Sequence, residues 1–183
     1  VWNSEVARLS WLVDPNDPTP EDPTLPLVEL RAGALIEVRA RVGMEFRGKY
    51  NVNENHYPDD ESNFDIVLLE PDYGLPTPIE IEMSDFMSGG TFLFDSTRSS
   101  GAELYQSRLV TLKGVTITNS ANWKTYGDVT VSDGTQQFTI KLGYNEAFAT
   151  AALPRGTLDI TGVFDQEDAA SPYVDSYRLW ACR

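Results

Sequence analysis

The sequence is poor in the residues that build most covalent and metal-dependent sites. It has one cysteine, Cys182, and one histidine, His56, among 183 residues. A single cysteine excludes an intrachain disulfide and a cysteine-based metal site. It is therefore either a free or buried thiol or a link to another chain. Nucleophilic catalysis by a triad needs a base beside a nucleophile and an orienting carboxylate. Because His56 stands in a polar loop without a Gly-x-Ser-x-Gly motif, we expect no enzymatic activity.

Basic residues and long apolar runs are also scarce. The chain has 14 Lys and Arg residues against 28 Asp and Glu residues, for a formal net charge of -14. Phosphate backbones are bound mainly by clustered Lys and Arg, so this charge balance disfavours non-specific nucleic-acid binding. The longest apolar runs, residues 66–69 and 147–153, fall far short of the roughly 20 residues of a membrane span, so we predict no membrane insertion. The first residue is Val1, which leads us to expect a processed product or an excised fragment.

What is present indicates a packed β protein in three regions. Hydrophobic residues make up 41% of the chain and aromatic residues 11%, enough for a core. Residues 1–26 combine an apolar segment (1–13) with a spacer that holds five prolines (14–26). Proline fixes φ and removes a hydrogen-bond donor, so the spacer is extended. We predict a partial OB-like β domain over residues 27–103 and a complete OB-fold domain over 104–183.

The middle region alternates between apolar and polar residues with a period of two. Residues 34–42 show this pattern and predict a strand with one buried face. Residues 64–70 and 78–83 also predict strands. Residues 50–62 are polar and acidic, and residues 84–103 are rich in Gly, Ser and Asp, so both stretches are interpreted mostly as loop.

The C-terminal half carries clearer signals. Strands are predicted at residues 108–118, 128–132, 136–142, 157–164 and 176–182. Gly114 inside the first strand predicts a bulge or bend, and Asp133-Gly134 predicts a hairpin turn. Residues 145–153 are alanine-rich and predict a short helix with Asn145 as N-cap. Three strands, a helix and two more strands are the order of an all-β, five-stranded OB-type barrel. A β-sandwich is the alternative, although it would not explain the helix.

Several motifs resemble a known family. They are Gly33–Val42 (GALIEVRARV), residues 45–48 (EFRG), 66–68 (IVL), 74–78 (GLPTP), 103–110 (ELYQSRLV), 129–134 (VTVSDG) and 156–164 (GTLDITGVF). These stretches resemble the OB-fold repeat region of large bacterial extracellular nucleases and related uncharacterised secreted proteins. In that family, Gly-x-x-Ile/Val-x-Val-x-Gly marks the fourth barrel strand. Residues 33–40 follow this spacing with Ala40 in place of the usual last glycine, and residues 156–162 also begin and end with glycine but are one residue shorter. The resemblance implies an extracellular or cell-surface location, and it carries over no nuclease activity, because the catalytic domain of such proteins is a separate one.

Two groups of side chains are candidate binding sites. Five aromatic residues could line an open barrel face and stack on bases or sugars: Trp123, Tyr126, Tyr144, Tyr173 and Tyr177. The alternative is that they pack in the core or at its rim. Acidic clusters could supply oxygen ligands to Ca²⁺: Asp59, Asp60, Glu61 and Asp65, with Asn63 between them, and Asp165, Glu167 and Asp168 in a second loop. Neither cluster fits the EF-hand spacing, so solvated acidic loops are the alternative.

These observations favour a non-catalytic structural or interaction module of a secreted or cell-surface protein, with protein partners that include copies of itself. One specific hypothesis is strand addition, in which residues 1–13 extend the open sheet of a neighbouring copy. The alternative is an ordinary N-terminal strand packed on its own barrel. A different class of function, carbohydrate or oligonucleotide binding by the aromatic face, stays open.

Overall fold

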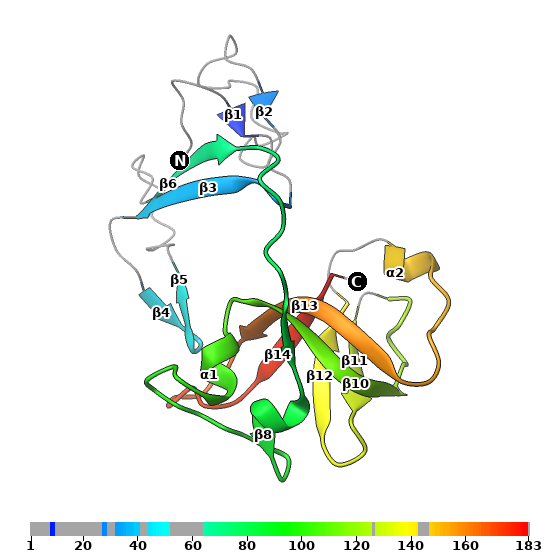
Figure 1. The fold of residues 1–183 in the computed structure, drawn as a ribbon. Coiled ribbons are helices and arrows are strands. Elements are labelled where there is room, and N and C mark those ends of the chain that lie inside the picture. Colours follow the sequence, from blue (N-terminus) through cyan, green and yellow to red (C-terminus); the bar gives the residue numbers. More distant parts are fainter. Residues whose placement is uncertain are drawn as a thin grey trace. The chain divides into compact units, whose positions relative to one another are not determined.

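The structure is a computed structural model that describes residues 8–9, 27–28, 32–40, 44–51, 64–125, 127–142 and 147–182. It is mostly β, as predicted. Two compact units make up the chain: Val1–Phe46 with Tyr50–Pro76, and Arg47–Lys49 with Thr77–Arg183. Within the described ranges, no helix has the length and hydropathy needed to span a membrane. Figure 1 labels the elements along the chain.

The N-terminal unit contains short paired strands. β1 (Arg8–Leu9) runs parallel to β2 (Leu27–Val28), and β3 (Leu35–Ala40) runs antiparallel to β6 (Phe64–Glu70). The predicted strands at 34–42 and 64–70 are confirmed. The predicted buried face of the first one is wrong, because Ile36 and Val38 are 39% and 42% exposed. A two-stranded sheet has little surface against which to bury a face.

A hairpin that the sequence did not predict lies between these strands. β4 (Met44–Phe46) and β5 (Lys49–Asn51) are joined by Arg47 and Gly48, whose φ angles are 53° and 88°. Two consecutive positive φ angles are typical of the two-residue hairpin turns that match strand twist. The loop predicted from Tyr50 onward is therefore wrong at its first two residues, which continue β5.

The C-terminal unit is built on one six-stranded sheet. Its strands are β7 (Ile79–Ile81), β10 (Leu109–Asn119), β11 (Asp128–Ser132), β12 (Gln137–Lys141), β13 (Leu158–Gln166) and β14 (Tyr177–Ala181). Their order is β11-β12-β14-β13-β10-β7, with a further pairing between β10 and β11. The last five of these strands confirm the five predicted in this half. Pairing thus runs from β10 through β11, β12, β14 and β13 back to β10, and we call these five strands the strand ring.

Gly114 lies at the point where β10 changes its partner along one edge. Residues 109–115 of β10 pair with β13. On the other edge of the strand, residues 110–112 pair with β7, and residues from Thr116 onward pair with β11. The register against β13 shifts between Leu112 and Val115, and Gly114 has a φ of 68° at this point. A bulge bends its strand and increases the local twist. The predicted bulge is therefore confirmed, and it lies where the pairing of β10 with β7 ends and its pairing with β11 begins.

The Asp133-Gly134 hairpin is confirmed between β11 and β12. The Asp133 carboxylate accepts hydrogen bonds from the backbone N–H groups of Thr135 and Gln136, each at 2.8 Å. Partial burial acts to raise the pKa of Asp133, but these hydrogen bonds outweigh it and the pKa is lowered. The turn residue thus satisfies backbone donors that the two strands leave unpaired.

Residues 77–103 group with the C-terminal unit. β7 pairs in parallel with β10, and the following segment holds a 3₁₀ turn (Met83–Asp85), β8 (Met87–Ser88), β9 (Thr91–Phe92) and α1 (Gly101–Tyr105). The loop predicted over this segment missed α1. The Gly, Ser and Asp residues that precede α1 led to the loop prediction, whereas α1 itself contains the good helix formers Ala102, Glu103 and Leu104. Burial of Ala102 and Glu103 against the rest of the unit stabilises the helix.

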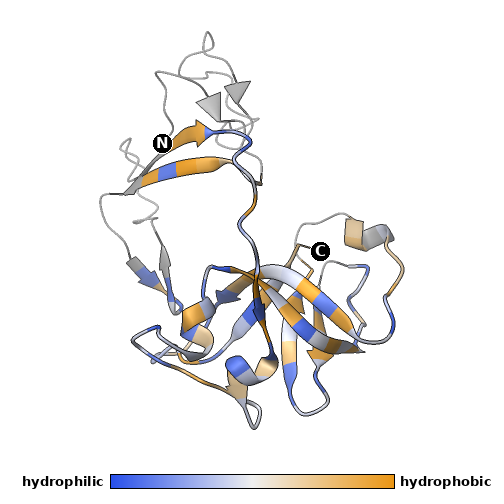
Figure 2. Cartoon of the chain, in the orientation of Figure 1, coloured by the Kyte–Doolittle hydropathy of each residue, from blue (hydrophilic) through white to orange (hydrophobic). Residues whose placement is uncertain are grey.

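Alternating hydropathy separates the inside of the strand ring from its outside, as the banded strands of Figure 2 show. Val110, Val131, Ile140, Phe164 and Leu179, one from each strand, lie in a single buried core. The helix predicted over 145–153 is present as α2 (Ala147–Thr150), shorter than expected. Figure 1 shows α1 and β8 at one end of the strand ring and α2 at the other.

Candidate functional site

The two ends of the strand ring are filled differently. Near α1 and β8, Phe86 is fully buried, and its ring centroid lies 4.9 Å from that of Phe138 and 5.1 Å from that of Phe164. Both contacts are edge-to-face, an arrangement that aromatic rings prefer. A large side chain supplied by the segment before α1 therefore closes this end.

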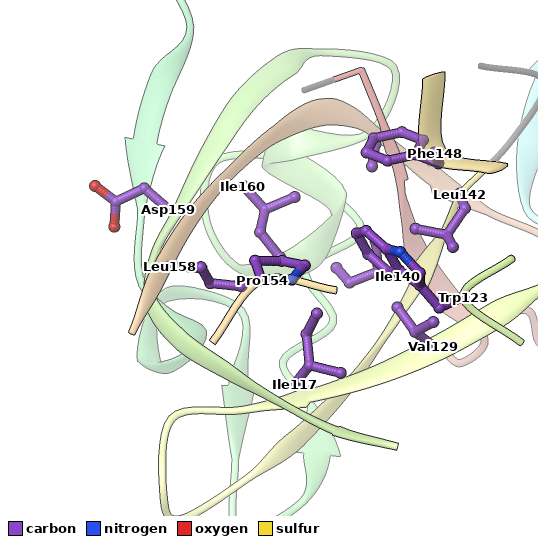
Figure 3. A pocket seen from close by; sticks show the side chains of 11 residues that line it. Ile117, Trp123, Val129, Ile140, Leu142, Phe148, Pro154, Leu158, Asp159 and Ile160 are labelled. Carbon is purple, nitrogen blue, oxygen red and sulfur yellow. The ribbon is translucent and has the colours of Figure 1, made fainter. Parts of the chain in front are cut away.

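The end beneath α2 is not filled, and a pocket of about 120 Å³ remains there. Figure 3 shows its side chains converging from the strands and from the α2 segment. The lining consists of Ile117, Trp123, Val129, Ile140, Leu142, Phe148, Pro154, Leu158, Asp159, Ile160 and Ala181. All five strands of the ring contribute to it, together with Trp123 and the α2 segment.

The composition of the α2 segment explains the space. Residues 147–152 read Ala-Phe-Ala-Thr-Ala-Ala, so Phe148 is the one large apolar side chain among them. Phe148 is also the one residue among them that lines the pocket, whereas Ala147 and Ala152 are exposed. The Phe148 ring packs edge-on against Trp123 at a centroid distance of 5.6 Å. A short alanine-rich helix thus covers the ring end and leaves a void below it.

The polar groups of the lining residues form hydrogen bonds and an ion pair with groups outside the pocket. Trp123 donates its Nε1–H to the carbonyl of Ala151 at 3.0 Å. The Asp159 carboxylate pairs with Lys113 at 2.6 Å and accepts the Gly114 N–H at 3.0 Å. The hydrogen bond from Lys113 is the main reason that the pKa of Asp159 is lowered. Figure 3 shows this carboxylate pointing away from the pocket, which leaves an apolar interior.

The structure separates the predicted aromatic residues. Trp123 lines the pocket, whereas Tyr177 is 2% exposed and donates its hydroxyl to the Glu103 carboxylate. Burial is the largest cause that raises the pKa of Tyr177. Tyr173 is half-buried, and its carbonyl accepts a hydrogen bond from Gln166. Tyr126 and Tyr144 lie outside the described residues. The described members of the set therefore do not form one exposed face.

Sequence reasoning missed Trp180, which lies on the outer face of β14. Its ring centroid is 5.2 Å from the Arg178 guanidinium carbon and 6.0 Å from Lys141 Nζ, within the range of cation–π contacts. The alternation of side chains along β14 could have indicated this position. Tyr177 and Leu179 share one face, which places Trp180 on the other.

The acidic residues after residue 164 take part in ion pairs and turns. Asp165 was predicted in a loop but lies in β13, where it pairs with Arg178 of β14. Arg178 and Trp180 donate hydrogen bonds to its carboxylate at 3.0 and 2.9 Å. Burial acts to raise the pKa of Asp165, and these groups together with Lys49 outweigh it, so the pKa is lowered. Glu167 pairs with Arg178 and Arg47, and the Arg178 hydrogen bond is the first cause of its lowered pKa.

Asp168 accepts hydrogen bonds from the backbone, unlike the ion-paired Asp165 and Glu167. It is buried, and it accepts hydrogen bonds from the backbone N–H groups of Ala170 and Asp175, both at 3.0 Å. It therefore stabilises the loop before β14. Of the other predicted calcium ligands, Asp59, Asp60 and Glu61 lie outside the described residues, and Asp65 lies on β6. Among the residues that the structure describes, no group of three acidic, His or Cys side chains is arranged to hold a metal ion.

The turn Arg47–Lys49 is held by polar contacts within the C-terminal unit. The Gly48 carbonyl accepts a hydrogen bond from Gln106 at 2.9 Å, and the Arg47 carbonyl accepts the Asp168 N–H at 3.0 Å. Lys49 pairs with Asp165 at 3.3 Å. These contacts join residues more than fifty positions apart, which no local pattern encodes.

Comparisons of this chain with protein-family models, with curated proteins and with solved structures find no match.

Proposed function

We propose that the strand ring is a five-stranded barrel of the OB type and that the chain acts as a non-catalytic interaction module. Supporting the first part, the pairing order β10-β11-β12-β14-β13-β10, with β12 parallel to β14, agrees with OB topology. The position of α2 between β12 and β13 also agrees with it. Mutual pairing of all five strands would protect the edges that otherwise invite aggregation.

One observation carries the functional part of the proposal. Two acids that share Arg178 as an ion-pair partner, Asp165 and Glu167, are 14% and 31% exposed. A general acid or base works at a pKa near the operating pH, whereas the pKa of each of these carboxyls is lowered further below it. Their geometry suits cross-strand stabilisation. We propose that the module belongs to a secreted or cell-surface protein, on the strength of the family resemblance and the acidic composition.

Self-association is the first activity to test. Strand addition by residues 1–13 would join copies through main-chain hydrogen bonds. Arg8–Leu9, inside this segment, pair with Leu27–Val28 of the same chain. For these two residues, this pairing favours the alternative that the N-terminal strand packs within its own chain. Light scattering should give the mass of an assembly for the full chain and of a monomer after deletion of residues 1–13. The control is a chain with residues 1–13 scrambled, which should also be monomeric. An unchanged mass after deletion rejects strand addition.

Trp180 favours a second candidate function. An aromatic ring on an outer strand face, close to Lys141 and Arg178, is the combination that stacks on sugars or bases and attracts their charged groups. Retention on single-stranded DNA at several salt concentrations and a glycan panel would test it. Trp180→Ala should abolish retention, and Val163→Ala on the adjacent strand is the matched control. No retention of the unmodified chain on either material excludes this function.

Calcium binding is a narrower proposal for the loop around Asp59, Asp60 and Glu61. The supporting observation is the sequence alone, where clustered carboxylates supply hard oxygen ligands. Calorimetric titration with Ca²⁺ should show saturable heat that disappears in an Asp59→Asn, Asp60→Asn variant. Equal heats in both proteins would reject the site.

A further inference from the structure

We infer that the pocket beneath α2 binds one small, uncharged hydrophobic molecule of about the size of a benzene ring. This inference goes beyond the proposed function and does not depend on it. It rests on the volume of the pocket, on the chemistry of its walls and on the construction of its cover.

The volume decides the size of the ligand. The space is about 120 Å³. Apolar cavities of about 150 Å³ lined by Leu, Ile and Phe stay dry and bind benzene or xenon. Drug-sized ligands need pockets of roughly 300 Å³ or more. The pocket therefore suits a single ring or a short branched alkyl group, and excludes a nucleobase with its sugar or an oligosaccharide.

The walls decide the polarity of the ligand. Ten of the eleven lining residues are apolar or aromatic, and the remaining one is Asp159. The Asp159 carboxylate is held outside by Lys113, and the Trp123 N–H is held by the Ala151 carbonyl. A charged ligand that leaves water for an apolar site needs polar partners there, which the described lining does not offer. An uncharged hydrocarbon surface needs none.

The cover provides a route for exchange. α2 spans only Ala147–Thr150, and the Trp123–Ala151 hydrogen bond and the Trp123–Phe148 ring contact tie its segment to the ring. Helices of one turn have little intrinsic stability in water. The pocket is also partly open to solvent, so a small molecule can enter it without opening of the strand ring. Because Trp123 touches both the cover and the pocket, it reports on occupancy.

The test uses the full chain labelled with 5-fluorotryptophan and observed by fluorine NMR. The chain has four tryptophans, and Trp123→Phe assigns the Trp123 resonance. Benzene is the probe, and benzoate supplies the same ring with a negative charge. We expect a saturable shift of the Trp123 resonance with benzene and a rise of the unfolding midpoint temperature. Benzoate at equal concentration should produce neither effect.

Two variants on one strand separate pocket binding from surface adsorption. Ile160→Phe places extra carbons in the pocket and should abolish the response to benzene. Val163→Phe adds the same ring on the outer face of β13, where Val163 is 38% exposed, and should leave the response intact. If Ile160→Phe does not fold, Ala181→Leu fills the pocket from β14 with the same expected loss. An unsaturable or absent benzene response, an equal response to benzoate, or a full response in a folded, filled variant would overturn the inference.

Discussion

Replacement of Gly48 tests the packing of the C-terminal unit. Gly48 is buried at the turn of the β4–β5 hairpin with a φ of 88°. A Cβ atom added there would lie 2.1 Å from Oε1 and 2.4 Å from Cδ of Gln166. Real Cβ atoms do not approach other atoms so closely, so either the turn or the Gln166 side chain must move in Gly48→Ala.

Neither can move without losing hydrogen bonds. Gln166 is fully buried, and its Nε2 donates to the carbonyls of Tyr173 at 2.8 Å and Asp175 at 3.0 Å. Its Oε1 accepts a hydrogen bond from Gln106 at 2.9 Å. Withdrawal of the turn would instead break the bond from Gln106 to the Gly48 carbonyl. A methyl group at residue 48 therefore breaks at least one buried hydrogen bond.

The cost has three parts. Alanine in the left-handed region costs about 1–2 kcal/mol. Overpacking a filled site costs about 1–3 kcal/mol. Each hydrogen bond lost contributes about 1 kcal/mol. Because relief of the clash and loss of the bonds overlap, we expect Gly48→Ala to lower the free energy of unfolding by about 3–5 kcal/mol.

Urea unfolding followed by tryptophan fluorescence and circular dichroism measures this loss. The matched control is Gly134→Ala, because Gly134 has a φ of 98° but nothing within 4 Å of the added Cβ. Its free energy of unfolding should fall only by the cost of placing alanine in the left-handed region, about 1–2 kcal/mol. Gln166→Ala should destabilise the Gly48→Ala variant less than it destabilises the original chain. Equal losses for the two glycine variants would refute the argument that Gln166 excludes a side chain at residue 48.

Three further predictions concern the core and its charges. Phe164→Ala should lower the free energy of unfolding by about 3–5 kcal/mol in the same urea assay, because this fully buried ring stacks on Phe138 at 5.7 Å. Tyr177→Phe should lower it by about 1–3 kcal/mol, because the buried Glu103 carboxylate loses its hydroxyl donor; an unchanged urea midpoint would show that the bond is not needed. The pKa of Asp165 is lowered in the folded chain, so its contribution to stability is present above the unfolded pKa and is lost as the pH falls through the folded pKa. Urea midpoints measured from about pH 6 down to about pH 3 should fall less steeply for Asp165→Asn.

The sequence by itself determined the strands of the C-terminal half, their order and two of their special residues. Alternation of apolar and polar side chains is a local property, because successive residues of a strand face opposite sides. It located β10 to β14 to within two residues. Gly114 and Asp133-Gly134 marked a bulge and a turn because their backbone conformations are set by the residues themselves.

Only the tertiary structure decided which side chains meet. Arg47 and Glu167 form an ion pair across 120 positions of sequence, and Gly48 lies against Gln166. The aromatic set shows the same limit. Trp123 and Trp180 are the same type of residue, yet Trp123 lines an apolar pocket and Trp180 lies on the outer face of its strand. A local pattern specifies the direction of a side chain relative to its own strand, whereas partners, pKa values and cavities depend on segments that meet only when the chain has folded.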